Sequence, residues 1–283
     1  MTCRELYLLA RRRLGGAGVD SPGADAAALA QRFLGLDRAG LALHGEEAPP
    51  PQREAAFLQA VEERAARRPL QYILGEWEFM GLPLAVGEGV LCPREDTAVL
   101  VEELARRLGE RPRPRGLDLC AGTGAVALGL RTLLPQAEVL CLELSDRAFP
   151  YLEENLRRHG KGLAAARKGD VLSPALAGEF TPGSLDFIAS NPPYIETGEL
   201  PGLQPEVQRE PALALDGGAD GLVFYRAIAR LWAPLVKPGG LVAVETGESQ
   251  GPAVERIFQQ AGLTAVETAQ DWAGLDRVVS GLR

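Results

Sequence analysis

The tetrapeptide Asn191-Pro192-Pro193-Tyr194 constrains the fold of this chain more than any other stretch. It directly follows residues 184–190, a largely apolar run with the length of a buried strand. Two consecutive prolines remove two backbone donors and fix φ, so the chain must leave the sheet along a stiff path. Open α/β sheets bind ligands at the carboxyl ends of their strands. The tetrapeptide therefore predicts a ligand site at the end of this strand.

The chemistry of the tetrapeptide suits a nitrogen ligand. The side-chain oxygen of Asn191 beside a rigid main-chain carbonyl makes a pair of acceptors for a planar NH2 group. Tyr194 adds a flat face that can stack on that plane. The alternative is a surface turn, because Asn and Pro are ordinary turn residues. A second motif favours the ligand site.

This second motif is Asp118-Leu-Cys-Ala-Gly122-Thr-Gly124-Ala, which ends a short strand beginning near Gly116 and opens a predicted helix at 125–134. Glycines let the backbone approach a ligand closely, and the helix N-terminus supplies free N–H groups. Nineteen residues after Gly124, Glu143 ends the next predicted strand, residues 137–143. An acid at this distance can accept both hydroxyls of a ribose. The two motifs together predict a nucleoside-binding βαβ unit.

Two nucleoside cofactors are candidates for this unit: the dinucleotide NAD and S-adenosylmethionine. Gly122-Thr-Gly124-Ala-Val-Ala127 also satisfies the loose dinucleotide pattern, which is a weak signal on its own. A carboxylate at Asp118 would repel a pyrophosphate, but it favours the ammonium and sulfonium charges of S-adenosylmethionine. Hydride chemistry also has no use for an amide-binding tetrapeptide. Methyl transfer is therefore the preferred interpretation.

These residues resemble a known family. The Asp-x-x-x-Gly-x-Gly motif, the acid after the second strand and Asn-Pro-Pro-Tyr are similar to class I S-adenosylmethionine-dependent methyltransferases that act on an exocyclic or amide nitrogen. Further patches resemble the release factor glutamine methyltransferases, often called HemK or PrmC. These patches are residues 68–79, 90–97, 210–213, 217–222 and 271–277.

The resemblance implies a Rossmann-like α/β domain with a mostly parallel seven-stranded sheet and helices on both faces. It implies methyl transfer to the side-chain nitrogen (N5) of the glutamine in the Gly-Gly-Gln motif of peptide-chain release factors, with S-adenosylhomocysteine as product. The chain departs from the family at Cys120, where glycine is usual, at Glu143, where aspartate is usual, and in the Pro93-Arg94-Glu95-Asp96-Thr97 patch. The candidate catalytic residues are Asn191, Pro192, Pro193 and Tyr194, and the candidate cofactor-binding residues are Asp118, Cys120, Ala121, Gly122, Thr123, Gly124, Glu143, Leu144, Asp170, Val171 and Asn191.

Composition agrees with an enzyme of the cytoplasm. The chain has 283 residues, enough for two domains, and its N-terminus lacks a signal-peptide core. No apolar run reaches the roughly eighteen residues of a membrane span. The four cysteines show no paired spacing, which predicts reduced thiols, and the two histidines lie far from any cysteine pair. We expect no metal site, no membrane association and a monomer.

Charge favours a protein substrate over nucleic acid. Residues 1–75 hold ten basic and nine acidic side chains, and the remaining 208 residues hold twenty and twenty-nine. A nucleic-acid methyltransferase normally has a basic face that neutralises phosphates. The nearest such stretch here, residues 111–115, is interpreted as a solvated linker. No nucleic-acid substrate is therefore expected.

Periodicity divides the chain into three parts. Residues 1–70 are predicted to form a helical domain, with helices at 4–14, 25–34 and 52–67. Because this region lacks any cofactor motif, we expect it to recognise the protein substrate. Residues 71–90 form a β-hairpin linker, in which Trp77 and Phe79 are interpreted as packing residues. Residues 91–283 are predicted to form the methyltransferase domain, with a helix starting at Thr97 and a strand at 241–246. Thr97 suits helix capping, and the resemblance alone implies a role for Arg94 and Thr97 near the cofactor.

Three hypotheses follow. The first is methylation of the release-factor glutamine, with the Asn191 side-chain oxygen and the Pro192 carbonyl accepting the two amide N–H bonds. Those bonds strengthen as positive charge develops on the nitrogen, so they favour the transition state. The second is methylation of a ribosomal-protein glutamine or of an adenine amino group. The third is a non-catalytic S-adenosylmethionine-binding protein, against which the intact tetrapeptide argues.

Overall fold

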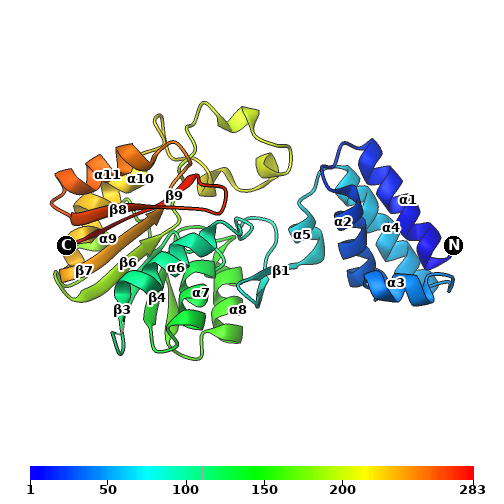
Figure 1. Ribbon diagram of the computed structural model, residues 1–283, viewed down its shortest axis with the longest axis horizontal. Helices are drawn as coiled ribbons and strands as arrows, with labels where there is room; N and C mark the ends of the chain where they lie inside the picture. The colour runs from blue at the N-terminus through cyan, green and yellow to red at the C-terminus, as the bar shows by residue number, and fades with distance from the viewer. Residues whose placement is uncertain (110) are drawn as a thin grey trace. The chain divides into compact units, whose positions relative to one another are not determined.

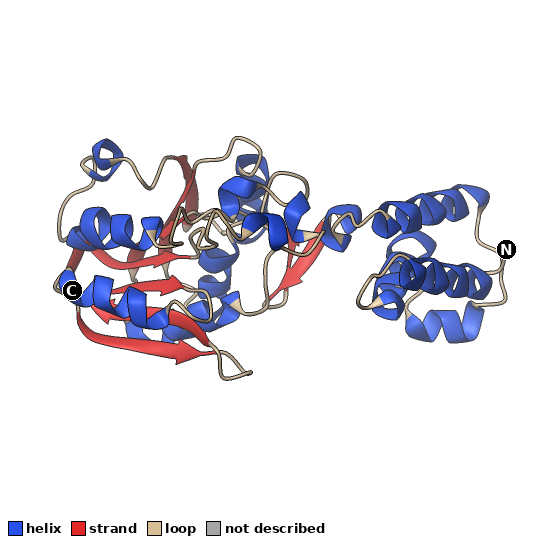
Figure 2. Cartoon of the chain, turned by 90° about the horizontal axis from the view of Figure 1, so that it is seen from above, coloured by secondary structure: helices blue, strands red, loops and turns tan. Residues whose placement is uncertain are grey.

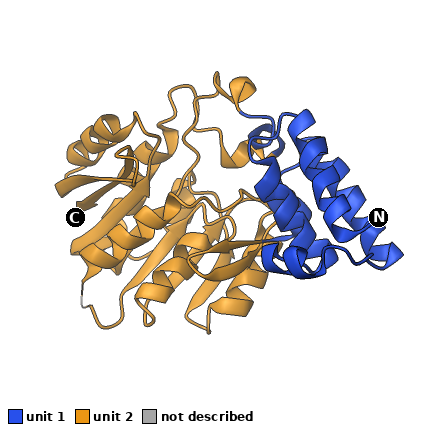
Figure 3. Ribbon diagram, turned by 45° about the vertical axis from the view of Figure 1, so that its right-hand side comes forward, with its two compact units in different colours: residues 1–76, 204–209 blue, residues 77–203, 210–283 orange. Residues whose placement is uncertain are grey.

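The structure is a computed structural model that describes residues 1–109 and 111–283. It consists of two compact units (Figure 3). Unit 1 comprises Met1–Glu76 and Gln204–Arg209, and unit 2 comprises Trp77–Leu203 and Glu210–Arg283. The predicted helical region, residues 1–70, lies within unit 1, and the predicted methyltransferase region lies in unit 2 except for residues 204–209.

Unit 1 is helical, and its three predicted helices are confirmed with small shifts at their ends. The first is fixed by a capping box, in which the Thr2 side chain accepts from the Glu5 N–H and the Glu5 side chain accepts from the Thr2 N–H. Two short helices were not predicted, and one of them is capped by the Asp37 side chain. The elements are α1 (Cys3–Gly16), α2 (Pro22–Leu29), which runs into a π-helical turn (Ala30–Leu34), α3 (Arg38–His44), α4 (Pro51–Ala65) and α5 (Leu70–Leu74).

The returning segment of unit 1, Gln204–Arg209, is held by a network of ion pairs. Arg64 donates to Asp25 at 2.6 Å and to Glu206 at 2.7 Å, and Arg67 donates to the other oxygen of Glu206 at 2.7 Å. Burial would raise the pKa of Glu206, but the two arginines outweigh burial and hold that pKa below its usual value. Because a buried charge is tolerated only when it is paired, these residues depend on one another.

Unit 2 contains a hairpin and a seven-stranded sheet (Figure 1). The hairpin is shorter than predicted because α5 occupies the first residues of the expected strand pair. Its strands are β1 (Glu76–Phe79) and β2 (Leu82–Ala85). The sheet has the order β5-β4-β3-β6-β7-β9-β8 and is parallel except for β9, which pairs antiparallel with β7 and β8. Its strands are β3 (Arg115–Leu119), β4 (Glu138–Glu143), β5 (Ala164–Lys168), β6 (Leu185–Ser190), β7 (Val236–Glu245), β8 (Thr264–Gln270) and β9 (Asp276–Leu282).

Both faces of this sheet are buried, and each has its own hydrophobic core. On β6, Phe187 belongs to one core and Ile188 to the other, because successive side chains point to opposite faces. Phe79 of the hairpin packs into the first core, which confirms its interpretation as a packing residue. Helices lie on both faces in Figure 2. They are α6 (Thr97–Leu108), α7 (Ala125–Leu133), α8 (Phe149–His159), α9 (Pro174–Ala177), α10 (Val223–Ala227) and α11 (Gly251–Gln260).

Two further predictions concern membrane spans and the state of the cysteines. Within the described residues, no helix has both the length and the apolar character needed to span a bilayer. The four cysteines are free thiols: Cys3, Cys92 and Cys141 are buried, and Cys120 is half-buried.

Candidate functional site

The register of the parallel strands gathers the predicted site residues at one edge of the sheet. Leu119 at the end of β3 pairs with Leu142 of β4 on one side and with Ser190 of β6 on the other. Ser190 in turn pairs with Val244 of β7. The residues that follow these positions therefore lie next to one another. They are Cys120, Glu143, Asn191 and Glu245.

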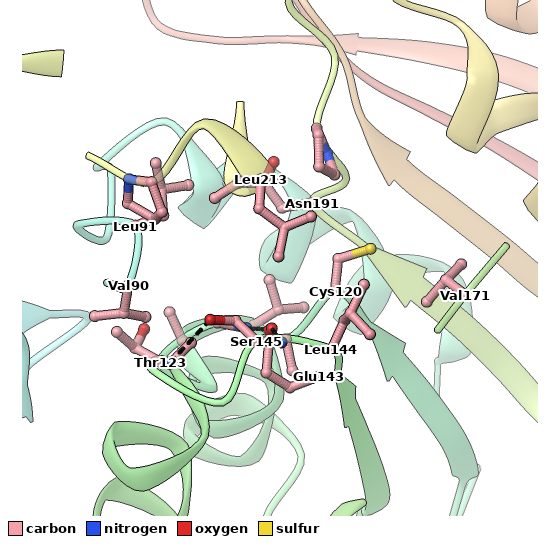
Figure 4. A pocket seen from close by; sticks show the side chains of 18 of the residues that line it. Val90, Leu91, Cys120, Thr123, Glu143, Leu144, Ser145, Val171, Asn191 and Leu213 are labelled. Atoms are coloured by element: carbon pink, nitrogen blue, oxygen red, sulfur yellow. Dashed lines mark hydrogen bonds between the residues drawn. The ribbon is translucent and has the colours of Figure 1, made fainter. Parts of the chain in front are cut away.

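A pocket of unit 2 lies at this edge (Figure 4). It takes residues from the glycine-rich loop, from the ends of β4, β5 and β6, and from two further segments, residues 89–97 and 211–214. The predicted site residues that line it are Cys120, Ala121, Gly122, Thr123, Glu143, Leu144, Asp170, Val171, Asn191 and Pro193. Four other candidate residues do not line the pocket: Asp118, Gly124, Pro192 and Tyr194.

The loop between β3 and α7 requires unusual backbone conformations. Gly122 and Gly124 have φ of 54° and 81°, in the left-handed region that glycine adopts without strain. A Cβ at Gly124 would also lie 2.9 Å from Leu152 Cδ1. Cys120 has φ of 59°, which explains why glycine is the usual residue in the family that this chain resembles. Cysteine at this position keeps the loop conformation at an energetic cost.

Glu143 joins the two loops that border the pocket. Its Oε2 accepts from the Gly122 N–H at 2.8 Å, and its Oε1 accepts from the Ser145 N–H at 2.6 Å. Each carboxylate oxygen has a second lone pair, so both can still accept from a ligand hydroxyl. Asp170, after β5, adds a second carboxylate to the lining and accepts from the Leu172 N–H at 2.8 Å.

Asp118 is 1% exposed and acts on the loop from behind. Its Oδ2 accepts from the Ala127 N–H at 3.1 Å, which satisfies a free donor in the first turn of α7. Burial, the largest influence, raises the pKa of Asp118 to about 7, and the bond to Ala127 opposes that rise. A direct contact between Asp118 and a cofactor stays a prediction.

Asn191 is oriented by a residue almost one hundred positions away. Its Nδ2 donates to Thr97 Oγ1 at 3.2 Å, and both residues line the pocket. The interpretation of Thr97 as a capping residue is wrong: Asp96 is the N-cap, its side chain makes no capping bond, and Thr97 is the first helical residue of α6. Thr97 is 3% exposed, and its hydroxyl accepts the hydrogen bond from Asn191.

The backbone of Tyr194 is fixed by three neighbours. Gln250 Nε2 donates to the Tyr194 carbonyl at 2.8 Å. A Cβ at Gly217 would lie 2.7 Å from Tyr194 Cα, and a Cβ at Gly221 would lie 2.5 Å from the Tyr194 carbonyl oxygen. Close approach of the two backbones therefore requires these glycines. Burial, aided by Glu245, raises the pKa of Tyr194 to about 12, so its hydroxyl stays neutral.

Glu210 holds the segment of the pocket wall before α6. It is buried, accepts from the Cys92 N–H at 3.0 Å and pairs with Arg94. Pro211, which follows it, lines the pocket. Glu210 and Pro211 belong to the 210–213 patch on which the family resemblance partly rests, and these contacts place that patch at the pocket wall.

Several of these residues were not recognised as parts of the site from the sequence. The sequence around Gln250 and Glu245 does not indicate a functional role, since polar residues at or after the end of a strand are common. Gly217 and Gly221 belong to a patch that the resemblance singled out without a role. The signal for Thr97 was its place in the Pro-Arg patch.

The lining suits a nucleoside ligand. Gly122 leaves room near the backbone, since the nearest atom to a Cβ there is 3.9 Å away. Glu143 and Asp170 supply acceptors for hydroxyl and amino groups. Asn191 places a side-chain amide at the pocket wall. S-adenosylmethionine therefore fits the donor and acceptor set of the pocket.

The chain matches two protein-family models and is similar in sequence or fold to several known proteins. A family model described as PrmC N-terminal domain matches residues 5–75, and one described as Methyltransferase small domain matches residues 93–204. The chain is 41% identical to a release factor glutamine methyltransferase from Geobacter sulfurreducens, over 99% of this chain and 96% of that protein. It is 42% identical to one from Moorella thermoacetica, over 98% and 97%. A solved methyltransferase from Pyrococcus furiosus shares the fold, with 16% identity, a TM-score of 0.51 and coverage of 81% and 97%.

Proposed function

The chain belongs to the family of release factor glutamine methyltransferases, and from this premise we propose that it methylates N5 of the glutamine in the Gly-Gly-Gln motif of peptide-chain release factors. S-adenosylmethionine is the proposed methyl donor. The observation that carries the proposal is the position of Asn191, which directly follows the buried strand β6, in the same pocket as Glu143 and the glycine-rich loop.

Each part of the pocket has a proposed task. Glu143 accepts hydrogen bonds from the ribose, and the loop around Gly122 follows the cofactor closely. Asn191 and the Pro192 carbonyl accept the two N–H bonds of the glutamine amide. S-adenosylmethionine supplies the methyl group as an electrophile when it is bound.

Orientation is the main contribution of the chain to the reaction. An amide nitrogen is a poor nucleophile because its lone pair is delocalised into the carbonyl. Two acceptors hold the NH2 group in one plane and stabilise the positive charge that develops on it. The neutral Tyr194 packs beside that plane. As the N–C bond forms and the C–S bond of the donor breaks, the nitrogen becomes cationic, and it then loses one N–H proton to water. No base is therefore needed before the methyl group has moved.

Surface charge supports a protein substrate over an adenine in nucleic acid. The basic stretch at residues 111–115 is already engaged within unit 2. Arg113 and Arg115 pair with Glu138 at 2.6 and 3.0 Å, and Arg111 donates to the Gly239 carbonyl at 2.7 Å. Glu138 balances part of the positive charge of this stretch, which weakens it as a phosphate-binding face.

Unit 1 is the proposed recognition element for the release factor. All residues that line the pocket belong to unit 2, so unit 1 is left for another task. A chain that begins at Arg68 should bind S-adenosylmethionine but methylate intact release factor poorly. Because this truncation removes Arg64 and Arg67, it should also carry Glu206→Gln, which avoids an unpaired carboxylate. Full activity on intact release factor would contradict the proposal.

Mass spectrometry tests the function itself. Wild-type enzyme and S-adenosylmethionine are incubated with a release factor and with a version in which the glutamine of Gly-Gly-Gln is replaced by glutamate. We expect one methyl group on that glutamine in the first protein and none in the second. Methylation of the glutamate version, of a ribosomal protein alone or of nucleic acid would show that the glutamine assignment is wrong.

A further inference from the structure

Behind the pocket lies a buried acid that the proposed mechanism does not use. Glu245 is the last residue of β7 and is 1% exposed. Its Oε2 has no hydrogen-bond partner among the described residues. The pairing of Ser190 with Val244 places Glu245 beside Asn191, because each follows directly in its strand. A carboxyl group kept at such a place at an energetic cost needs an explanation.

Thr97 links this acid to the amide-binding residue. Its hydroxyl accepts from Asn191 Nδ2 at 3.2 Å. The same hydroxyl lies close enough to Glu245 to act on that acid, and it holds the pKa of Glu245 below the value that burial alone would give. The three side chains come from α6, from the end of β6 and from the end of β7, and they form a chain that runs from the pocket into the core.

The direction of each bond in this chain follows from the groups themselves. A carboxylate can only accept, so the single hydroxyl hydrogen of Thr97 must point to Glu245. The lone pairs of Thr97 then remain for Asn191, and only the NH2 end of the Asn191 amide can donate to them. Oδ1 is thereby left as the end of the amide that can accept from a ligand.

We propose that Thr97 and Glu245 are positioning residues, which lock the Asn191 amide with its oxygen toward the substrate NH2 group. The inference rests on the proposed function, since it assigns the acceptor that the glutamine amide requires. A flipped Asn191 would present its NH2 end to the substrate NH2 group, and two donors repel each other. The relay therefore prevents the unproductive orientation.

The protonation of Glu245 sets the direction of the relay. Protonated Glu245 can donate, which frees the Thr97 hydrogen to point toward Asn191 and removes the preference for one amide orientation. Burial raises the pKa of Glu245 to about 7, and the Thr97 hydroxyl opposes that rise. The charged or titratable groups that surround Glu245 are Arg94, Asp96, Tyr194, Tyr225 and Arg277.

The first test compares two replacements of Thr97. Thr97→Val keeps the shape but removes the hydroxyl, and Thr97→Ser restores it. We expect the single-turnover rate of release-factor methylation to fall roughly 10- to 100-fold in the valine variant, and to recover to within about fivefold in the serine variant. The Kd for S-adenosylmethionine, measured by calorimetry, should change less than about twofold in both. Equal rates in the two variants would overturn the proposal.

A matched control comes from a second threonine bonded to a glutamate. Thr268 Oγ1 donates to Glu255 at 2.5 Å, and neither residue lines the pocket. Thr268→Val removes the same kind of bond and should leave the methylation rate unchanged. A loss in Thr268→Val as large as that in Thr97→Val would show a general folding effect and would overturn the specific role of Thr97.

The second test uses Glu245→Gln, a permanently neutral shape match for the protonated acid. The ratio of wild-type to Glu245→Gln single-turnover rates should exceed about fivefold near pH 8 and approach one as pH falls through about 7. Titrations of the substrate and of Asp118 affect both enzymes equally and cancel in the ratio. A ratio independent of pH would overturn the role of Glu245. If wild-type enzyme leaves the release factor unmethylated, the proposed function fails instead, which distinguishes the two failures.

Discussion

The two halves of the pocket are built in different ways. The proposed cofactor half, formed by the ends of β3, β4 and β5, depends on local backbone geometry: two left-handed glycines and a carboxylate that accepts from backbone N–H groups. The proposed acceptor half, at the ends of β6 and β7, depends on side chains that are distant in the sequence, among them Thr97 and Gln250. The first half is thus specified largely by short sequence motifs, and the second by side chains that only the tertiary fold brings together.

This difference predicts separable defects. Changes in the cofactor half should alter the affinity for S-adenosylmethionine, because they alter the surface that holds it. Changes in the acceptor half should alter the rate of methyl transfer, because they alter how the amide is oriented. A variant that affects both quantities equally would break the distinction.

The largest effect is expected for Asn191→Ala. Removing one acceptor that acts in the transition state should lower the single-turnover rate about 10²–10³-fold, by analogy with the donors of oxyanion holes. Calorimetry should find the affinity for S-adenosylmethionine nearly unchanged. Asn191→Asp keeps an acceptor but adds charge, and it should remain well below wild type. A tenfold or greater loss of cofactor affinity in Asn191→Ala would assign the residue to the other half.

Glu143→Ala is the matching change in the cofactor half. Each lost charge-assisted hydrogen bond costs on the order of 1.5–3 kcal/mol as an upper guide, and less where water takes its place. The Gly122 and Ser145 N–H groups also lose their acceptor. Glu143→Gln, which keeps the shape and one acceptor, should fall between alanine and wild type. Unchanged calorimetric affinity in Glu143→Ala would remove Glu143 from the cofactor site.

Gly217→Ala tests the backbone support of the acceptor half. The added Cβ would lie 2.7 Å from Tyr194 Cα, so the tetrapeptide must shift. We expect a roughly tenfold lower methylation rate and a stability loss of about 1–3 kcal/mol, as for other overpacked sites. Gly202→Ala is the control, because a Cβ there meets nothing within 4 Å. Equal urea-unfolding midpoints and rates in both variants would argue against close packing at Gly217.

Cys120→Gly should have the smallest effect. The left-handed conformation costs a non-glycine residue about 1–2 kcal/mol, but glycine adds about 0.5–1 kcal/mol of unfolded-state entropy. The net gain in unfolding free energy should therefore lie between about 0 and 1.5 kcal/mol. Cys120→Ala retains the strained φ and should show no gain in the same urea titration. Destabilisation by Cys120→Gly beyond that of Cys120→Ala would show that strain at this position is unimportant.

The sequence predicted the cofactor half better than the acceptor half, for a physical reason. The run at 137–143 and the helix at 125–134 were confirmed as β4 and α7, because their apolar periodicity and flanking residues are local. The bond between Thr97 and Asn191 depends on how α6 packs near the ends of β6 and β7, which no local pattern specifies. Short helices such as α3 were missed because few residues supply their periodicity.

The Gln204–Arg209 segment has a consequence for the order in which the protein can fold during synthesis. Unit 1 starts at the first residue, and its first segment ends at Glu76. Glu206, in its second segment, is synthesised some 130 residues later. Until that segment has been synthesised, Arg64 can pair with Asp25 but not with Glu206, and Arg67 lacks its bond to Glu206. The part of the protein that is translated first is thus among the last to be completed.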